Sequence, residues 1–230
     1  ERQKVKISLE KILEQDETFG IGKNDEIKNI SFGLYAKEDV VSSSGTVIPA
    51  DGLIEIITLD ENGAATANTD LPFGSYYVKE IATDEHYILS DTQYPFTFEY
   101  AGQNTETVEI KVNDGKPIEN KLIYGSVSGK KIDENGEALG GALIGIFKAD
   151  ETEFTKEHAI MTATSEKDGS FSFAKVPYGQ WIVREIEAPE GFVLDDTSYE
   201  VNIGENEQVI EVKITDEYIH GNIELTKVDA

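Results

Sequence analysis

The chain of 230 residues repeats its own sequence, and this repetition constrains the fold more than any other feature. The segment 71–81, Leu-Pro-Phe-Gly-Ser-Tyr-Tyr-Val-Lys-Glu-Ile, aligns without a gap with the segment 176–186, Val-Pro-Tyr-Gly-Gln-Trp-Ile-Val-Arg-Glu-Ile. Self-similarity of this kind is typical of tandem copies of one unit. It predicts two homologous domains, residues 1–122 and 123–219. Residues 220–230 repeat the Gly, Lys and Asp spacing that opens the second domain, so we expect them to begin a further repeat.

Within each repeat, apolar and polar residues mostly alternate, as in residues 5–9 (Val-Lys-Ile-Ser-Leu) and 200–203 (Glu-Val-Asn-Ile). A period of two is that of a half-buried β-strand. Asp-Gly and Asn-Gly pairs, which are typical of hairpin turns, interrupt the pattern at 51–52, 62–63, 135–136 and 168–169. The sequence therefore predicts an all-β protein built from many short antiparallel strands.

The charge and the absence of cysteine limit the partners and the chemistry. With 45 acidic and 20 basic residues, the net charge of −25 repels nucleic-acid phosphates and anionic lipid headgroups. Without cysteine, disulfides, thiolate zinc sites and cysteine nucleophiles are excluded. Hydrophobic residues make up 39% of the chain, which is enough for packed cores. We therefore expect a folded monomer that binds neither nucleic acid nor membrane.

Other candidate sites in the sequence are weak. The acidic turns at 60–63 and 133–136 lack the ligand spacing of an EF-hand, so they are interpreted as hairpin turns rather than calcium sites. The three histidines have no metal-site spacing and are expected at surface or turn positions; they are His86, His158 and His220. No nucleophile elbow, phosphate loop or dinucleotide motif occurs. The sequence predicts no cofactor, no metal and no catalysis on an external substrate.

Three polar positions recur in step in both repeats: a lysine in the first strand, a glutamate in a central strand, and an amide or acid in the last strand. They are Lys11, Glu80 and Asn120 in the first repeat, and Lys131, Glu185 and Asp216 in the second. The alternation places Lys11 and Glu80 in phase with core residues, so both side chains are expected to point inward. Because a buried charge is costly, burial lowers the pKa of an amine and raises the pKa of a carboxylic acid.

A neutral amine beside a protonated acid can react with a carbonyl held between them. The amine is the nucleophile, the acid polarises the carbonyl and transfers protons, and the fold supplies proximity. The expected product is an amide between two side chains, with ammonia released from Asn120 and water from Asp216. Two alternatives stay open. One is a buried salt bridge with no covalent bond, and the other is Asn113 as the acceptor in the first repeat.

The second repeat carries further motifs around these positions. It opens with Gly125, Lys131 and Asp133, and residues 181–192 read Trp-Ile-Val-Arg-Glu-Ile-Glu-Ala-Pro-Glu-Gly-Phe. In these residues the chain resembles the Cna B-type (SpaA-like) domains of Gram-positive surface adhesins and pilins. The resemblance implies tandem immunoglobulin-like or transthyretin-like β-sandwiches that carry intramolecular isopeptide bonds.

The resemblance also implies roles for the recurring residues. Glu185 would be catalytic for a bond between Lys131 and Asp216. Glu80 would be catalytic in the same way for a bond between Lys11 and Asn120. The first repeat departs from the family pattern after its glutamate, because residues 82–86 read Ala-Thr-Asp-Glu-His where the second repeat has Ala-Pro-Glu-Gly at 188–191.

The function implied is that of stalk repeats in a cell-wall-anchored adhesin or pilus-like surface protein outside a Gram-positive cell. Its partners would be the neighbouring repeats, with a host or matrix protein bound through another domain. Its only chemistry would be single-turnover cross-linking, so it would not be an enzyme in the usual sense. The alternative is a binding module whose loops engage a host or extracellular-matrix protein directly.

Overall fold

The computed structural model describes residues 3–221, and the predicted all-β class is confirmed. The chain divides between Leu122 and Ile123 into two compact units, called here the N-terminal and C-terminal units. The helical segments among the described residues are two short 3-10 turns, η1 (Glu26–Asn29) and η2 (Val112–Gly115). Within residues 3–221, no helix has the length and apolar character needed to cross a membrane. The predicted start of a further repeat lies almost entirely outside the described residues.

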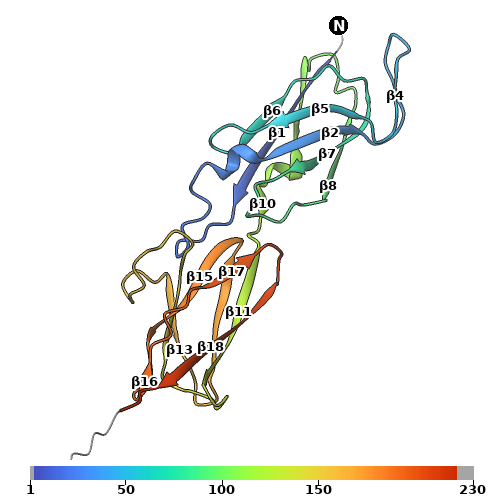
Figure 1. The fold of residues 1–230 in the computed structure, drawn as a ribbon. Coiled ribbons are helices and arrows are strands. Elements are labelled where there is room, and N and C mark those ends of the chain that lie inside the picture. Colours follow the sequence, from blue (N-terminus) through green and yellow to red (C-terminus); the bar gives the residue numbers. More distant parts are fainter. Residues whose placement is uncertain (1–2, 222–230) are drawn as a thin grey trace, which may run out of the picture. The chain divides into compact units, whose positions relative to one another are not determined.

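The N-terminal unit contains two four-stranded sheets and a small hairpin (Figure 1). The first sheet consists of β10 (Ile118–Asn120), β1 (Lys4–Leu13) and β6 (Ala64–Ala67), with β9 (Thr107–Lys111) also paired to β1. The second sheet has the order β5 (Leu53–Thr58), β2 (Ser31–Ala36), β7 (Gly74–Ala82) and β8 (Gln93–Phe98). The hairpin consists of β3 (Val40–Val41) and β4 (Val47–Ile48).

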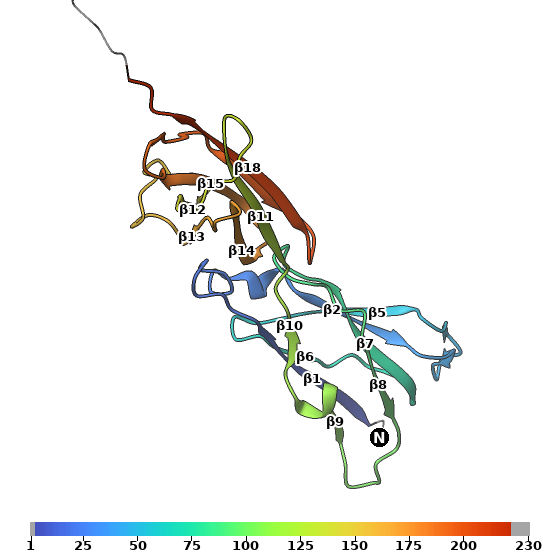
Figure 2. The same ribbon diagram turned by 90° about the horizontal axis from the view of Figure 1, so that it is seen from below.

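The C-terminal unit repeats the arrangement with two four-stranded sheets (Figure 2). One has the order β14 (Ser170–Pro177), β11 (Tyr124–Asp133), β18 (Val209–Tyr218) and β16 (Phe192–Val193). The other has the order β13 (Met161–Thr164), β12 (Leu143–Lys148), β15 (Gly179–Glu187) and β17 (Tyr199–Ile203). The strand that carries the first-repeat glutamate, β7, thus corresponds to β15, which carries the second.

Each unit has its core between its two sheets, and long strands such as β1 and β18 bury alternate side chains. In the N-terminal unit, Val5, Ile7 and Leu9 of β1 belong to one buried cluster with Phe32 of β2 and Val78 of β7. Strand β1 keeps the predicted alternation, since the residues between these three are exposed or half-buried. Lys11 continues the inward-facing series, so the polar site is an extension of the core.

The prediction that the strands are antiparallel is wrong for two pairs in the N-terminal unit and for one pair in the C-terminal unit. Strand β1 pairs in parallel with β10 and β9, and β11 pairs in parallel with β18. Alternation reports burial on one face and is the same for both directions of pairing, so it carries no information about strand direction. The first and last strands of each unit therefore lie side by side and run the same way.

The acidic stretches 60–63 and 133–136 are tight turns, and the prediction of a hairpin is wrong for the first. The turn at 133–136 closes an antiparallel bridge between Ile132 and Ala138, whereas the turn at 60–63 joins β5 to β6, which belong to different sheets. The amide of Gly63 donates to the carbonyl of Asp60 at 3.1 Å, and the amide of Gly136 donates to the carbonyl of Asp133 at 3.0 Å. Both aspartates also accept hydrogen bonds from backbone amides inside their own turns. Their carboxylates are therefore used to hold the turns.

Candidate functional site: a buried lysine, glutamate and amide or acid in each unit

The three predicted residues of the N-terminal unit lie together in its core. Lys11, Glu80 and Asn120 are each 2% exposed. Lys11 Nζ donates to Asn120 Oδ1 at 2.5 Å and lies 3.3 Å from Glu80 Oε1. Asn120 Nδ2 donates to both carboxylate oxygens of Glu80 at 2.9 Å. The glutamate thus contacts the nitrogen of the amide, and the lysine contacts its oxygen.

The predicted residues of the C-terminal unit form the same cluster. Lys131, Glu185 and Asp216 have no exposed side-chain surface. Lys131 Nζ is in hydrogen-bonding contact with Asp216 Oδ1 and lies 3.2 Å from Glu185 Oε1. Both units therefore bring an amine, a carboxyl group and a second carbonyl group into contact in a region without water access.

The strand register explains why the sites match. Leu13 is paired with Asn120 in the N-terminal unit, and Asp133 is paired with Asp216 in the C-terminal unit. In each first strand, the lysine lies two positions before the residue that is paired with the acceptor. Residues two positions apart in a strand point to the same face, so the lysine and the acceptor are diagonal neighbours on one face of the sheet. The neighbouring residues Glu10 and Lys130 are exposed, which confirms the predicted register of the two lysines.

A turn glycine fixes the backbone at each lysine. The carbonyl of Gly63 accepts from the amide of Lys11 at 2.7 Å, and the carbonyl of Gly169 accepts from the amide of Lys131 at 2.7 Å. Both glycines have a φ of +79°, and a Cβ at either position would collide with the lysine carbonyl oxygen. The Asn-Gly and Asp-Gly turns seen in the sequence therefore place the lysine strands as well as reversing the chain.

Burial shifts the pKa of one group in each site, Lys11 and Glu185, in the direction that favours its uncharged form. Desolvation lowers the pKa of Lys11, although attraction to Glu80 opposes the shift. Desolvation raises the pKa of Glu185 to about 7, supported by the nearby Asp216 and opposed by the amide of Asp195 and by Lys131. Among the described residues, no donor forms a hydrogen bond to Glu185 Oε1 or Asp216 Oδ2, although both atoms are buried. A proton shared between these two carboxyl groups, which interact with each other, would supply a donor at these atoms.

Sequence reasoning missed the backbone groups that orient the glutamates. The amide of Ser90 donates to Glu80 Oε2 at 3.1 Å, and the amide of Asp195 donates to Glu185 Oε2 at 2.9 Å. Each donor lies ten residues after its glutamate. The repeat alignment brings these two positions into step, but nothing in the sequence shows that their amides donate to the glutamates.

Thr83 was also missed. Its Oγ1 lies 2.9 Å from Asn120 Nδ2, and the corresponding residue three positions after the other glutamate is Ala188. Thr83 belongs to the segment in which the first repeat departs from the Ala-Pro-x-Gly pattern. The departure was visible in the sequence, but its contact with Asn120 depends on the fold of the loop.

The rival acceptor Asn113 lies in the η2 turn with a φ of 54°, and its Nδ2 donates to the carbonyl of Lys116 at 3.1 Å. Within the described part of the chain, the residue that hydrogen-bonds to the Lys11 amine is Asn120. The geometry therefore favours Asn120 over Asn113.

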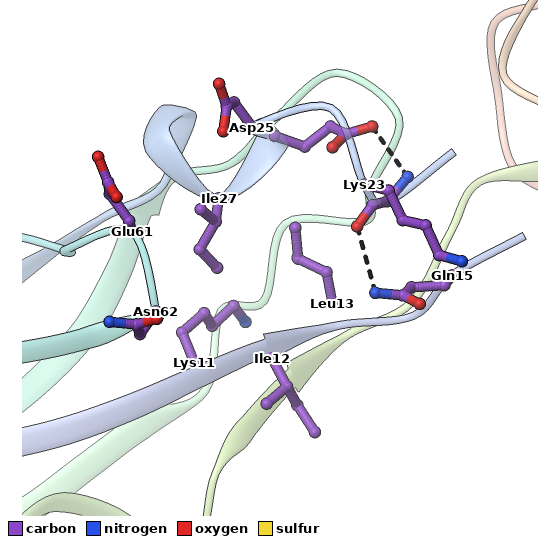
Figure 3. Close-up of a pocket in the computed structure, with 11 residues that line it drawn as sticks. Lys11, Ile12, Leu13, Gln15, Lys23, Asp25, Ile27, Glu61 and Asn62 are labelled. Carbon is purple, nitrogen blue, oxygen red and sulfur yellow. Dashed lines mark hydrogen bonds between the residues drawn. The ribbon is translucent and has the colours of Figure 1, made fainter. Parts of the chain in front are cut away.

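A surface pocket of about 320 Å³ borders the strand of Lys11 (Figure 3). One wall is the loop that precedes η1, in which Glu26 accepts from the amides of Gly22 and Asn24 at 2.8 and 2.5 Å. Figure 3 shows Leu13 and Ile27 beside the lysine. The Lys11 side chain itself has no exposed surface, so the pocket does not open the site to solvent.

Residues 3–221 contain no group of three or more His, Asp or Glu side chains arranged to hold a metal ion. His86 Nδ1 lies 2.6 Å from Asp84 Oδ1, and His158 Nδ1 lies 2.8 Å from Thr155 Oγ1. These histidines therefore contact neighbours within four residues of themselves.

Comparison with known proteins assigns the fold family. The model of the SpaA prealbumin-like fold domain matches residues 17–116 and again residues 125–218. The chain belongs to this family. The predicted family and the predicted class of tandem β-sandwiches are thus confirmed. A search of curated proteins found no match.

Solved structures show the same fold at low sequence identity. The Bacillus anthracis TIE protein is 20% identical over 94% of this chain, with a TM-score of 0.65, and this chain spans only 34% of its length. A C-terminal fragment of the pilus adhesin SpaC from Lactobacillus rhamnosus GG is 14% identical, with a TM-score of 0.59, over 97% of this chain and all of the fragment. Each is similar to both units of this prealbumin-like protein.

Proposed function

We propose that the two prealbumin-like units are stalk repeats of a pilus-like or cell-wall-anchored adhesin on a Gram-positive cell, and that an isopeptide bond closes each unit. The observation that carries the proposal is the shared register that puts a buried lysine beside a side-chain carbonyl on the parallel last strand. Its similarity to a pilus adhesin fragment supports the surface role.

In the N-terminal unit, the neutral amine of Lys11 attacks Cγ of Asn120. A C–N bond forms, the bond from Cγ to Nδ2 breaks, and ammonia leaves. Protonated Glu80 gives its proton to the departing nitrogen, which its two oxygens already contact at 2.9 Å, and takes a proton from the lysine nitrogen in exchange. Exclusion of water keeps the amine uncharged and prevents hydrolysis from competing.

In the C-terminal unit, the amine of Lys131 attacks Cγ of neutral Asp216, a C–N bond forms and one Cγ–O bond breaks. Glu185 gives its proton to the departing hydroxyl, which leaves as water, and takes a proton from the lysine nitrogen. The acceptor must be a neutral carboxylic acid, because a carboxylate resists attack by an amine. The site holds one base and two acids, so it needs one more proton than the N-terminal site. The raised pKa of Glu185 provides a place for that proton near neutral pH.

The bonds would change how each unit carries tension. Tension entering the N-terminal unit would cross from Lys11 to Asn120 and bypass the strands between them. It would then follow the chain to Lys131 and cross to Asp216. Because the chain has no cysteine, such bonds would take the place of disulfides, and they resist reduction. Each reaction occurs once, so the units are not enzymes for an external substrate.

Single-molecule pulling from the two chain ends tests this function. The linked residues are separated by 109 and 85 positions, and unfolding without a link lengthens the chain by roughly 3.5 Å for each released residue. We expect the wild-type protein to show neither extension and the double variant Glu80→Gln, Glu185→Gln to show both. Full extension of the wild-type units would contradict a tension-bearing role.

A further inference from the structure

The departing nitrogen of Asn120 has a third contact that the proposed reaction does not use. Its two hydrogens face three acceptors, namely the two oxygens of Glu80 and Oγ1 of Thr83, each at 2.9 Å. One hydrogen serves the carboxyl group and the other serves the threonine hydroxyl. The leaving group of the N-terminal unit is therefore held from two sides before the reaction begins.

The C-terminal unit lacks this hydroxyl. Ala188 follows Glu185 by three positions, as Thr83 follows Glu80. The two loops share a backbone hydrogen bond at the same position. The amide of Tyr87 donates to the carbonyl of Asp84 at 3.0 Å, and the amide of Phe192 donates to the carbonyl of Pro189 at 3.2 Å. The hydroxyl is thus present where the acceptor would release ammonia, and absent where the acceptor would release water.

The loop that carries Thr83 is anchored by its next residue. Asp84 is 7% exposed, and its Oδ2 accepts from Asn29 Nδ2 at 2.7 Å. Its Oδ1 contacts the His86 ring at 2.6 Å and accepts from the His86 amide at 3.1 Å. These contacts fix the start of the loop, and with it the position of the threonine hydroxyl.

We propose that Thr83 is a further catalytic residue for ammonia release from Asn120, an inference that rests on the proposed cross-linking function. When Glu80 passes the proton to Nδ2, that nitrogen gains a third hydrogen and a positive charge. The hydrogen bond to Thr83 Oγ1 strengthens at this point, because hydrogen bonds from charged donors are stronger than neutral ones. The electron pair of the breaking C–N bond leaves with the nitrogen, and the carbonyl is restored.

The rate of ammonia loss in threonine variants tests the inference. Unlinked full-length chain, collected in denaturant directly after synthesis, is diluted into buffer, and peptide mass mapping follows each link with time. We expect Thr83→Ala and Thr83→Val to slow the link between Lys11 and Asn120 roughly ten-fold, the effect of losing one charge-assisted hydrogen bond. Thr83→Ser keeps the hydroxyl and should react at the wild-type rate. Alanine is the natural residue at the equivalent loop position of the C-terminal unit.

Water loss between Lys131 and Asp216 in the same molecules is the internal control, and it should proceed at the wild-type rate in every variant. Unchanged ammonia loss in Thr83→Ala and Thr83→Val would overturn the role of Thr83. So would equal slowing of both links, or failure of Thr83→Ser to restore the rate. Absence of ammonia loss from the wild-type protein would instead refute the proposed cross-link itself.

Discussion

The two units share a register, a buried lysine and a glutamate, and they differ in the acceptor and in the loop that follows the glutamate. Because Asn120 is an amide, the N-terminal site contains one base, Lys11, and one acid, Glu80. A neutral amine beside a protonated acid therefore carries the same number of protons as an ion pair. Asp216 adds a second acid to the C-terminal site. The comparison teaches that one strand geometry can support two leaving groups with different proton requirements.

The loops differ in a matching way. In the N-terminal unit the loop provides a hydroxyl to the departing nitrogen and is held by a buried aspartate, Asp84. In the C-terminal unit the same turn is formed by an Ala-Pro-Glu-Gly segment with no polar side chain at the position equivalent to Thr83. The parts that the two sites share are therefore in the strands, and the parts that differ with the leaving group are in the loop.

Replacing either glutamate should have the largest effect, and each replacement should affect only one of the two units. Glu80→Gln should abolish ammonia loss alone, and Glu185→Gln should abolish water loss alone, because each removes the proton carrier of one site. Each variant should lose on the order of 4 to 5 kcal/mol of unfolding free energy in the affected unit, as expected for opening a closed loop of this length. Intact mass and chemical denaturation measure the two effects. Water loss that persists in Glu185→Gln would show that this glutamate is not catalytic.

The second-largest expected effect is a difference in how the rates of forming the two links depend on pH. Glu185 has a raised pKa of about 7, so it holds its proton below this pH and loses it above. Because the reactive form of the C-terminal site contains this proton, its linking rate should fall about ten-fold for each pH unit above that value. The N-terminal reaction needs no extra proton and should be flat through the same range. Mass mapping of chains folded at a series of pH values checks this, and parallel profiles for the two links would contradict it.

Transferring the N-terminal chemistry to the C-terminal unit sharpens the comparison. Asp216→Asn should change the lost molecule at Lys131 from water to ammonia. Adding Ala188→Thr should then speed this ammonia loss roughly ten-fold, because the new hydroxyl faces the departing nitrogen. The same Ala188→Thr change with Asp216 retained is the control and should leave water loss unchanged. Equal rates with and without the threonine would show that the loop does not adapt to the leaving group.

The smallest expected effect concerns the anchor of the N-terminal loop. Asn29→Ala removes the 2.7 Å hydrogen bond to the buried carboxylate of Asp84 and should cost about 1 to 2 kcal/mol of local stability. Hydrogen exchange of amides in residues 83–90 measures this loss. Lys23→Ala, which breaks an exposed ion pair with Glu17, is the matched control and should leave exchange unchanged. Equal exchange in the two variants would show that Asp84 does not hold the loop.

Much of the site was predictable because strand alternation and repetition report on the same residues. Alternation placed Lys11 on the core face, and the repeat alignment identified Glu80 as the residue equivalent to Glu185. The parallel pairing of first and last strands was not predictable, since the burial pattern is identical for both directions. Thr83 and Ser90 were missed because loop residues have no period, and their contacts exist only once the chain has folded.

The most direct test of the central claim is the intact mass of the purified wild-type protein. We expect a mass below that of the sequence by one ammonia and one water, with the ammonia assigned to the link between Lys11 and Asn120 and the water to the link between Lys131 and Asp216. A protein with the full unmodified mass would contain neither isopeptide bond and would consist of two prealbumin-like units with buried ion pairs.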